Sequence, residues 1–255
     1  MLLHLVSTRP GSRVVPYFYC EPKNVKRSTL LLIDDEAHHA AHVLRHRIGD
    51  RIVAVDGRGM VYEAKIGRIS DSLVEARIVK KRRRPHEPIS SIAVAQGVLK
   101  GSRMDYAVEK LTELGVKRII PFVSARSTVL PDDEGGKVKR WRRISVAAMK
   151  QSERSILPAI SGVVSFDDLL TLSKEYDLFV LGWEEEKKNR MIDVDTKRTN
   201  SVLIGVGPEG GLQESEVEAA RSAGAITLTL GERKLRSETA SVVLTTLVLQ
   251  RLGDI

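Results

Sequence analysis

The alternation of strand-like and helix-like segments after Pro88 is the feature that most constrains the fold of this chain. Short apolar runs of strand length occur at residues 91–96, 118–123, 177–182, 201–206 and 225–230. Apolar residues recur at helical spacing in the segments that follow them, at residues 103–114, 138–152, 166–173, 212–223 and 237–251. Strands that alternate with helices form parallel sheets, which helices cover on both faces. We therefore predict an α/β domain built on one parallel sheet.

The first third of the chain has a different pattern, made of short strands and tight turns. Residues 51–56 and 61–66 alternate polar with apolar side chains, and Gly57-Arg58-Gly59 supplies a turn between them, which predicts a β-hairpin. A second pair of strands follows around residues 70–72, and residues 34–47 have the pattern of a short helix. Several short strands with one helix predict a small β-barrel.

The two patterns meet at a run of five basic residues, Lys80–Arg84, which is followed by Pro85 and Pro88. Proline interrupts both helices and sheets. We therefore place a linker at residues 85–88, between a first domain of residues 1–84 and a second domain of residues 89–255.

The net charge of +8 is divided unevenly between these domains. Residues 1–88 carry 17 Lys and Arg against 10 Asp and Glu, whereas residues 89–255 carry 24 against 23. A basic domain beside a nearly neutral one indicates that the first domain binds a polyanion such as a nucleic acid. A basic surface without a partner is the alternative.

Cysteine and hydropathy patterns favour the cytoplasm. Cys20 is the only cysteine, which excludes an internal disulfide and favours a reducing compartment. Residues 1–10 lack the apolar core of a signal peptide, and no apolar run reaches the roughly 18–20 residues that span a bilayer. His38 and His42 share a helical face, but no third ligand accompanies them, so no metal site is expected.

A glycine-rich segment, Gly205–Gly211, carries the clearest chemical signal. It fits the pattern G-x-G-x-x-G between a strand and a helix, as in dinucleotide-binding folds. Two features argue against a dinucleotide site: Glu209 would place a carboxylate where a pyrophosphate should bind, and only 45 residues follow Gly210. A phosphate-binding P-loop is excluded because no G-K-[ST] motif is present. Four glycines in seven residues instead let the backbone approach the adenine or ribose of a cofactor. The alternative, a structural turn, needs fewer glycines.

A second cluster, residues 230–240 (LGERKLRSETA), precedes the last helix. Ser237 is a good N-cap, and Glu238 and Thr239 fall in the first helical turn. A plain capped helix leaves Gly231 and the pair Arg236 and Glu238 as candidates for site chemistry. Residues 237–251 are apolar around most of the helix, which predicts either burial against a partner subunit or deeper burial within one chain.

The combination of GPEGG after a strand and LGxRxLRxETA before the last helix resembles the bacterial 16S ribosomal RNA (uracil-N3) methyltransferase family, within the trefoil-knotted SPOUT RNA methyltransferases. Further segments are similar to motifs of this family, namely Leu99-Lys100, Arg103-Met104-Asp105, Lys110–Val116, Gln151–Pro158 and His39–Arg45. Lys150 departs from the family pattern where an acidic residue is common, and Glu153 where a small residue is usual.

The resemblance implies a deep trefoil knot in the α/β domain and a PUA-like barrel before it, although knots are so rare that general rules of topology would reject one. It implies S-adenosylmethionine as cofactor and a homodimer that forms through residues 237–251. The residues that would line the cofactor site are Leu181, Glu184, Gly205, Gly207, Pro208, Glu209, Gly210, Gly211, Leu230, Gly231, Leu235, Ser237 and Thr239.

The resemblance also implies the acceptor, uridine N3 in 16S ribosomal RNA of the small ribosomal subunit. This nitrogen carries a proton and lies on the Watson–Crick edge, so the base must be unpaired or flipped. Arg154 and Arg236 are candidate donors to the base oxygens, with surface ion pairs or phosphate contacts as the alternative. Glu209 or Glu238 is the candidate to accept the proton or to orient the cofactor. Candidate RNA contacts are Arg45, Arg47, Arg82, Arg83, Arg84, Lys100 and Arg103.

Two other functions are compatible with these patterns. A related knotted enzyme would methylate a ribose 2′-hydroxyl or a different base of RNA. A ribosome-assembly factor would bind RNA without catalysis, but it would need degenerate cofactor loops, and the loops of this chain look intact.

Overall fold

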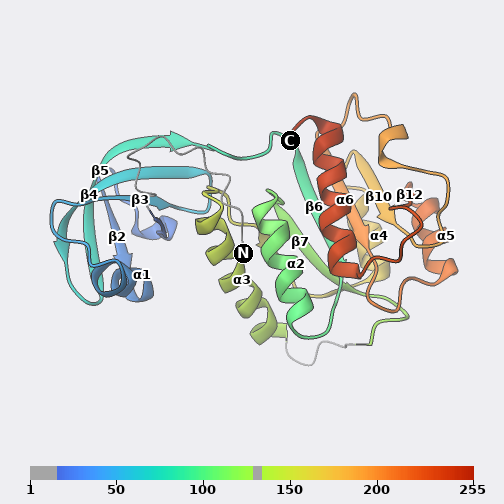
Figure 1. Cartoon of the computed structure of the whole chain (residues 1–255), viewed down its shortest axis with the longest axis horizontal. Helices are drawn as coiled ribbons and strands as arrows, with labels where there is room; N and C mark the ends of the chain where they lie inside the picture. Colours follow the sequence, from blue (N-terminus) through green and yellow to red (C-terminus); the bar gives the residue numbers. More distant parts are fainter. Residues whose placement is uncertain (1–15, 129–133) are drawn as a thin grey trace. The chain divides into compact units, whose positions relative to one another are not determined.

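The computed structural model describes residues 16–128 and 134–255, which form two compact units (Figure 1). The first unit ends at Arg83, and the second comprises residues 84–255 together with the turn at residues 57–59. Residues 1–10, in which no signal peptide is expected, lie outside the described residues. Among the helices that are described, none is long and apolar enough to cross a membrane.

The first unit is a five-stranded sheet with the order β1-β3-β4-β5-β2. Its strands are β1 (Tyr17–Tyr19), β2 (Thr29–Ile33), β3 (Arg51–Val55), β4 (Met60–Ile69) and β5 (Leu73–Arg83). β1 and β3 are parallel and the other pairs are antiparallel, so both predicted strand pairs are confirmed as β3–β4 and β4–β5. Most of the basic run belongs to β5.

The helix predicted at residues 34–47 is shorter and less regular than expected. α1 covers Asp34–His38, and a π-helical turn, η2, continues through His39–Val43. Residues 44–47 are not helical, because Arg45 takes a left-handed conformation with φ of 55°. A short 3-10 turn, η1 (Pro22–Asn24), completes the unit.

The second unit contains a seven-stranded parallel sheet with the order β12-β10-β11-β6-β7-β8, and β9 pairs with β7. The strands are β6 (Ser91–Gly97), β7 (Arg118–Val123), β8 (Ala159–Ile160), β9 (Val164–Ser165), β10 (Leu178–Gly182), β11 (Ser201–Val206) and β12 (Ile226–Leu228). All five predicted strands are present. β8 and β9 were not predicted, since two residues are too few to form a readable pattern.

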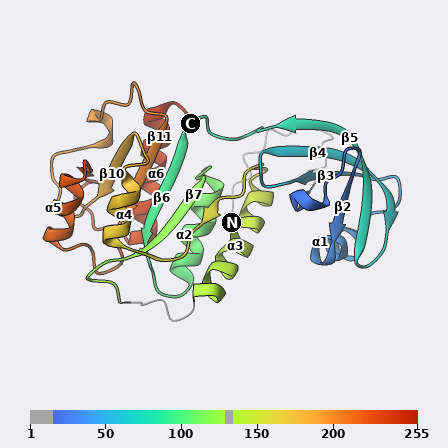
Figure 2. The ribbon, with the colours of Figure 1, turned by 180° about the vertical axis from the view of Figure 1, so that it is seen from behind.

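Helices cover both faces of this sheet, as the alternating pattern predicts (Figures 1 and 2). The helices are α2 (Ser102–Glu113), α3 (Glu134–Gln151), α4 (Phe166–Ser173), α5 (Glu214–Ser222) and α6 (Ser237–Leu252), with a 3-10 turn, η3 (Met191–Asp193). Alternate residues of β6 point to opposite faces: Ile92 and Val94 join the core with α2, α3 and α6, whereas Ala93 and Ala95 join the core with α4 and α5. This two-sided burial explains why the strands are apolar along their whole length.

The last helix, α6, is buried mainly along one side, where Ser241, Leu244 and Val248 face the sheet. Val242, Val243 and Leu247 on the rest of its surface are only half-buried. The apolar residues on several sides of α6 are therefore only partly covered within the described chain.

Candidate functional site

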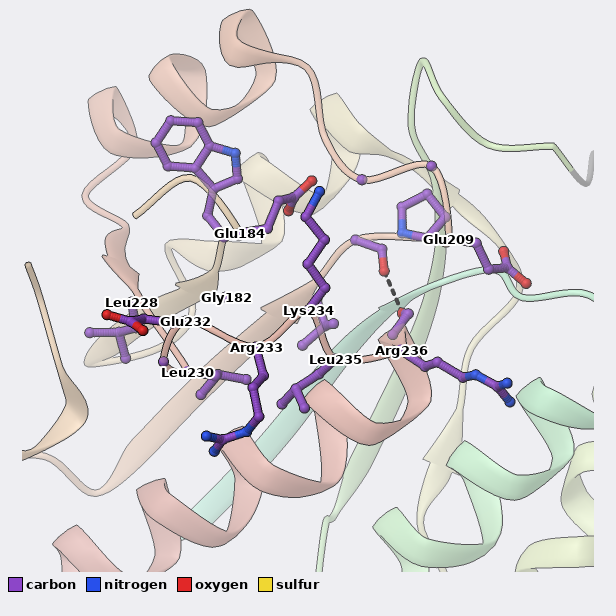
Figure 3. Close-up of a pocket in the computed structure, with 18 of the residues that line it drawn as sticks. Gly182, Glu184, Glu209, Leu228, Leu230, Glu232, Arg233, Lys234, Leu235 and Arg236 are labelled. Atoms are coloured by element: carbon purple, nitrogen blue, oxygen red, sulfur yellow. Dashed lines mark hydrogen bonds between the residues drawn. The ribbon is translucent and has the colours of Figure 1, made fainter. Parts of the chain in front are cut away.

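A pocket of about 510 Å³ lies where the carboxyl ends of β10, β11 and β12 meet in the second unit (Figure 3). The carboxyl edge of a parallel sheet is where ligands usually bind in open α/β folds. The loops that follow the three strands supply nearly all of its wall. The lining residues are Arg103, Gly182, Trp183, Glu184, Val206, Gly207, Pro208, Glu209, Gly210, Gly211, Leu228, Leu230, Gly231, Glu232, Arg233, Lys234, Leu235, Arg236 and Ser237.

The first wall is the glycine loop, which we define as residues 205–211. Four of its seven residues present backbone without a side chain. Gly211 has a φ of 72°, and a Cβ atom there would lie 2.2 Å from Oε1 of Glu184. The left-handed backbone conformation favours glycine at this position, and the absence of a side chain leaves room for the Glu184 carboxylate.

The second wall is the segment between β12 and α6. Leu228, Leu230 and Leu235 provide apolar surface, whereas Glu232, Arg233, Lys234 and Arg236 are exposed around it (Figure 3). Ser237 at the start of α6 donates a hydrogen bond to the backbone oxygen of Gly207 (2.5 Å, dashed line in Figure 3). The two sequence clusters are therefore connected directly across the pocket.

The third wall is the loop after β10, which Glu186 anchors. Its carboxylate accepts hydrogen bonds from Thr227 Oγ1 (2.6 Å) and from the backbone N–H groups of Lys187 and Lys188 (both 3.0 Å). These bonds, of which that from Thr227 is the strongest, lower the pKa of Glu186 to about 2. The guanidinium of Arg221 lies 5.0 Å from the ring centre of Trp183, which lines the pocket. The carboxylate thus fixes this loop against β12.

Most of the residues expected at a cofactor site do line this pocket. They are Glu184, Gly207, Pro208, Glu209, Gly210, Gly211, Leu230, Gly231, Leu235 and Ser237. Leu181, Gly205 and Thr239 do not line it; Gly205 instead packs against Leu181, whose Cδ1 atom would be 2.7 Å from a Cβ. The other lining residues were not singled out, but all except Leu228 lie in the three loops that the resemblance implies, residues 181–184, 205–211 and 230–239; they are Gly182, Trp183, Val206, Glu232, Arg233 and Lys234.

Two of the four candidate catalytic residues lie at the pocket. The side chains of Glu209 and Arg236 project to the same side of it in Figure 3. Oε1 of Glu209 accepts hydrogen bonds from the backbone N–H of Lys100 (3.0 Å) and from Arg103 (3.3 Å). Glu238 is buried beside the pocket rather than lining it, and among the described residues its Oε2 has no hydrogen-bond partner.

Arg154 lies elsewhere, in the interior of the second unit, with 1% of its surface exposed. It donates to the backbone oxygens of Thr112 (2.6 Å) and Val116 (3.1 Å), and to Oε2 of Glu87 (2.8 Å). Glu87 also accepts from the backbone N–H groups of residues 155 and 156. The expected contact with an RNA base does not fit this placement, because the guanidinium is enclosed and its bonds are with the protein itself.

The candidate RNA contacts are distributed over both units. In the first unit Arg45, Arg47 and Arg83 are exposed, and Arg82 lies 3.6 Å from Glu63. In the second unit Arg84, Lys100 and Arg103 are exposed. Arg103 also lines the pocket, so it is the one member of this set that lies at the pocket.

The chain matches two family models. Residues 85–249 match a model described as an RNA methyltransferase domain, and residues 32–79 match one described as an RNA methyltransferase PUA domain. Curated relatives cover most of the chain. Ribosomal RNA small subunit methyltransferase E of Bacillus subtilis is 34% identical, with 83% of this chain and 86% of that protein aligned. The protein of the same name from Mycobacterium bovis is 30% identical over 90% of this chain and 89% of its own length.

Solved structures have the same fold along nearly the whole chain. A ribosomal RNA small subunit methyltransferase E from Neisseria gonorrhoeae bound to S-adenosylmethionine superposes with a TM-score of 0.84 at 29% identity, covering 92% of this chain and 97% of its own. A protein from Legionella pneumophila in complex with the same cofactor gives a TM-score of 0.84 at 26% identity over the same shares. Both were solved with S-adenosylmethionine in place.

Proposed function

This chain belongs to the RNA methyltransferase family that includes ribosomal RNA small subunit methyltransferase E, and from this membership we propose that it methylates N3 of a uridine in 16S ribosomal RNA with S-adenosylmethionine as donor. The pocket carries the proposal, because it is built from the same two clusters, GPEGG and LGxRxLRxETA, on which the family resemblance rests. The substrate would be the small ribosomal subunit or its RNA.

The lining of the pocket fits this cofactor. Gly182, Gly207, Gly210 and Gly231 expose backbone groups that can bond to an adenine edge and ribose hydroxyls, and the leucines give apolar cover. Acidic and basic side chains around them match the amino and carboxyl groups of the methionine part. The volume of the pocket lies in the range of roughly 300–1,000 Å³ that is typical of small-molecule sites. S-adenosylmethionine supplies there a methyl group on a positively charged sulfur.

The residues of the chain would then prepare the base. We assign Arg236 to the uridine oxygens, where negative charge grows as N3 loses its proton, because its guanidinium is exposed at the pocket. We propose that Oε2 of Glu209 accepts the proton from uridine N3, since Oε1 of the same carboxylate already accepts hydrogen bonds from Lys100 and Arg103. Arg154 has no part in the chemistry in this account and stabilises the fold instead.

We further propose that a basic PUA-like domain, residues 1–84, delivers the RNA and that residues 85–88 link it to the methyltransferase domain. Its phosphate contacts would be Arg45, Arg47 and Arg82–Arg84, whereas Lys100 and Arg103 would contact the RNA from the methyltransferase domain. A homodimer would form through α6 and cover Val242, Val243 and Leu247, which are half-buried. We also propose the family's trefoil knot in the second unit and a cytoplasmic location.

Two measurements test this function. Titration calorimetry with S-adenosylmethionine is expected to show one binding site per chain, whereas a non-catalytic assembly factor would show none. Labelled methyl transfer onto unmodified 16S ribosomal RNA or small subunits, followed by digestion to nucleosides, is expected to yield N3-methyluridine. A 2′-O-methylated nucleoside or another methylated base would instead establish the alternative knotted enzyme.

A further inference from the structure

Gln96 is the one fully buried polar residue of β6. Its side chain is completely buried, between the alanine and valine residues that precede it and the glycine that follows. Burying an amide in a sheet destabilises a protein unless its polar atoms are hydrogen-bonded. An apolar side chain would fill the same space without this requirement, so the amide needs a specific explanation.

Both N–H groups and the oxygen of this amide are hydrogen-bonded. Nε2 donates to the backbone oxygen of Gly97 (2.9 Å) and to Oγ of Ser237 (2.9 Å), and Oε1 accepts from Oγ of Ser241. Because donors and acceptor all have partners, the amide has one orientation. The carboxyl end of β6 is thereby fixed to the first two turns of α6.

The hydrogen bonds continue from Gln96 to the wall of the pocket. Ser237 accepts from Gln96 and donates in turn to the backbone oxygen of Gly207. The neighbour of Gln96 supports the same loop, because a Cβ on Gly97 would lie 2.3 Å from the backbone nitrogen of Pro208. Two consecutive residues of β6 therefore support the glycine loop: Gln96 through its hydrogen bond to Ser237, and Gly97 through its close approach to Pro208.

We propose that Gln96 is a positioning residue for the cofactor site, and that it acts through Ser237 on the backbone of Gly207. A loop with four glycines has large backbone entropy, and ordering it on binding would weaken the affinity for a ligand. Fixing the Gly207 carbonyl in advance removes part of this cost. Gln96 does not line the pocket, so it acts without touching the cofactor. The inference rests on the proposed binding of S-adenosylmethionine.

Gln96→Met tests this proposal, because methionine keeps the length of the side chain and removes its hydrogen bonds. The matched control is Thr112→Val, since Thr112 is also fully buried and hydrogen-bonded, to Val108 and Ser145 of α2 and α3. We expect Gln96→Met to raise the Kd for S-adenosylmethionine about tenfold or more, with hydrogen exchange accelerated in the glycine loop. Both variants lose buried hydrogen bonds, so both should lower the unfolding free energy by a similar amount. Thr112→Val, however, should leave the Kd within about twofold of wild type.

A third variant, Ser237→Ala, tests the route of the effect. If Gln96 acts through Ser237, the double variant Gln96→Met/Ser237→Ala should bind S-adenosylmethionine no more weakly than whichever single variant has the higher Kd. Additive losses, or an unchanged Kd and unchanged hydrogen exchange in Gln96→Met, would overturn the proposal. If Gln96→Met does not fold, Ser237→Ala tests the proposal on its own. An unchanged Kd together with unchanged hydrogen exchange in the glycine loop of Ser237→Ala would then overturn the proposal. If the wild-type protein binds no cofactor, the proposed function fails, whereas exchange in the glycine loop still decides the role of Gln96.

Discussion

At the scale of single residues, Arg154 and Arg236 show how differently two candidate arginines can be placed. Both stand in family motifs, and nothing in the local sequence distinguishes them. Burial of Arg154 depends on Glu87, which is 67 residues away in the sequence, so no local pattern predicts it. Gln96 was missed for the same reason, because its partners Ser237 and Ser241 are 141 and 145 residues away.

Replacement of Arg154 is expected to affect stability first. In Arg154→Met the Glu87 carboxylate, whose side chain is 0% exposed, stays buried without its partner, so unfolding free energy should fall by about 3–5 kcal/mol in urea titrations. The control is Arg140→Met, because the Arg140 side chain is 62% exposed in its ion pair with Asp105 and its removal should change the unfolding free energy far less. If Arg154→Met were as stable as wild type but had lost methyl transfer, Arg154 would have a role in the reaction after all.

Replacement of Glu209 is expected to change the pH dependence of the reaction. Glu209→Gln keeps an oxygen for Lys100 and Arg103 but cannot take up the N3 proton, so turnover at neutral pH should fall about 10²–10⁴-fold. Above neutral pH the rate of the variant should rise about tenfold per pH unit, since hydroxide then removes the proton. Glu214→Gln, at an exposed position that does not line the pocket, should stay within a few-fold of wild type. A parallel pH profile for Glu209→Gln and wild type would exclude the proposed role.

At the scale of elements, the sequence predicts the strands and helices of the second unit well but the loops of its site less completely. Strands such as β6 and β11 are readable because both faces are buried and their residues are almost all apolar. The loops after β10 and β12 carry no periodicity, and the pocket residues Trp183 and Lys234 lie in them. Their conformation depends on contacts between loops, such as those of Glu186 with Thr227 and Arg221.

Glu186 makes the β10 loop sensitive to acid. Its pKa is about 2 in the folded protein against a usual value near 4.5, so its stabilising effect is complete above about pH 5 and is lost as pH falls towards 2. At pH 7 Glu186→Gln should lower the unfolding free energy by about 1–3 kcal/mol, and its difference from wild type should shrink below pH 4. Glu185→Gln, at an exposed neighbour, should show neither effect. A difference that is constant from pH 7 to pH 3 would argue against this role of the carboxylate.

At the scale of the whole molecule, the change in sequence pattern near Pro88 predicts a small β-barrel followed by a parallel α/β sheet. The structure has a five-stranded, mostly antiparallel sheet in the first unit and a parallel sheet in the second. Composition does not predict that residues 57–59, the turn of the first predicted hairpin, group with the second unit. Such a grouping depends on contacts between segments distant in the sequence. The proposed knot would have no local signal either, so the sequence can only imply it through resemblance.

Binding of RNA should depend steeply on salt, because phosphate contacts release counterions. For the wild-type protein the logarithm of RNA affinity should fall linearly with the logarithm of salt concentration. Arg45→Ala/Arg47→Ala should lower the magnitude of the slope by about 2, because each arginine is expected to neutralise one phosphate. Arg198→Ala, at an exposed position outside the predicted RNA contacts, should leave it unchanged. A flat salt dependence for the wild-type protein would contradict delivery of RNA by the basic domain.

The most direct test of the central claim is methyl transfer by wild-type protein and Arg236→Ala onto small ribosomal subunits that lack the modification, with the modified nucleotide mapped by mass spectrometry. We expect one N3-methyluridine in 16S ribosomal RNA with wild-type protein, and about 10²–10³-fold slower formation with Arg236→Ala, since one charge-stabilising donor is removed. We also expect nearly unchanged binding of S-adenosylmethionine by the variant. Methylation at a ribose or at another base, or no methylation of the small subunit at all, would contradict it.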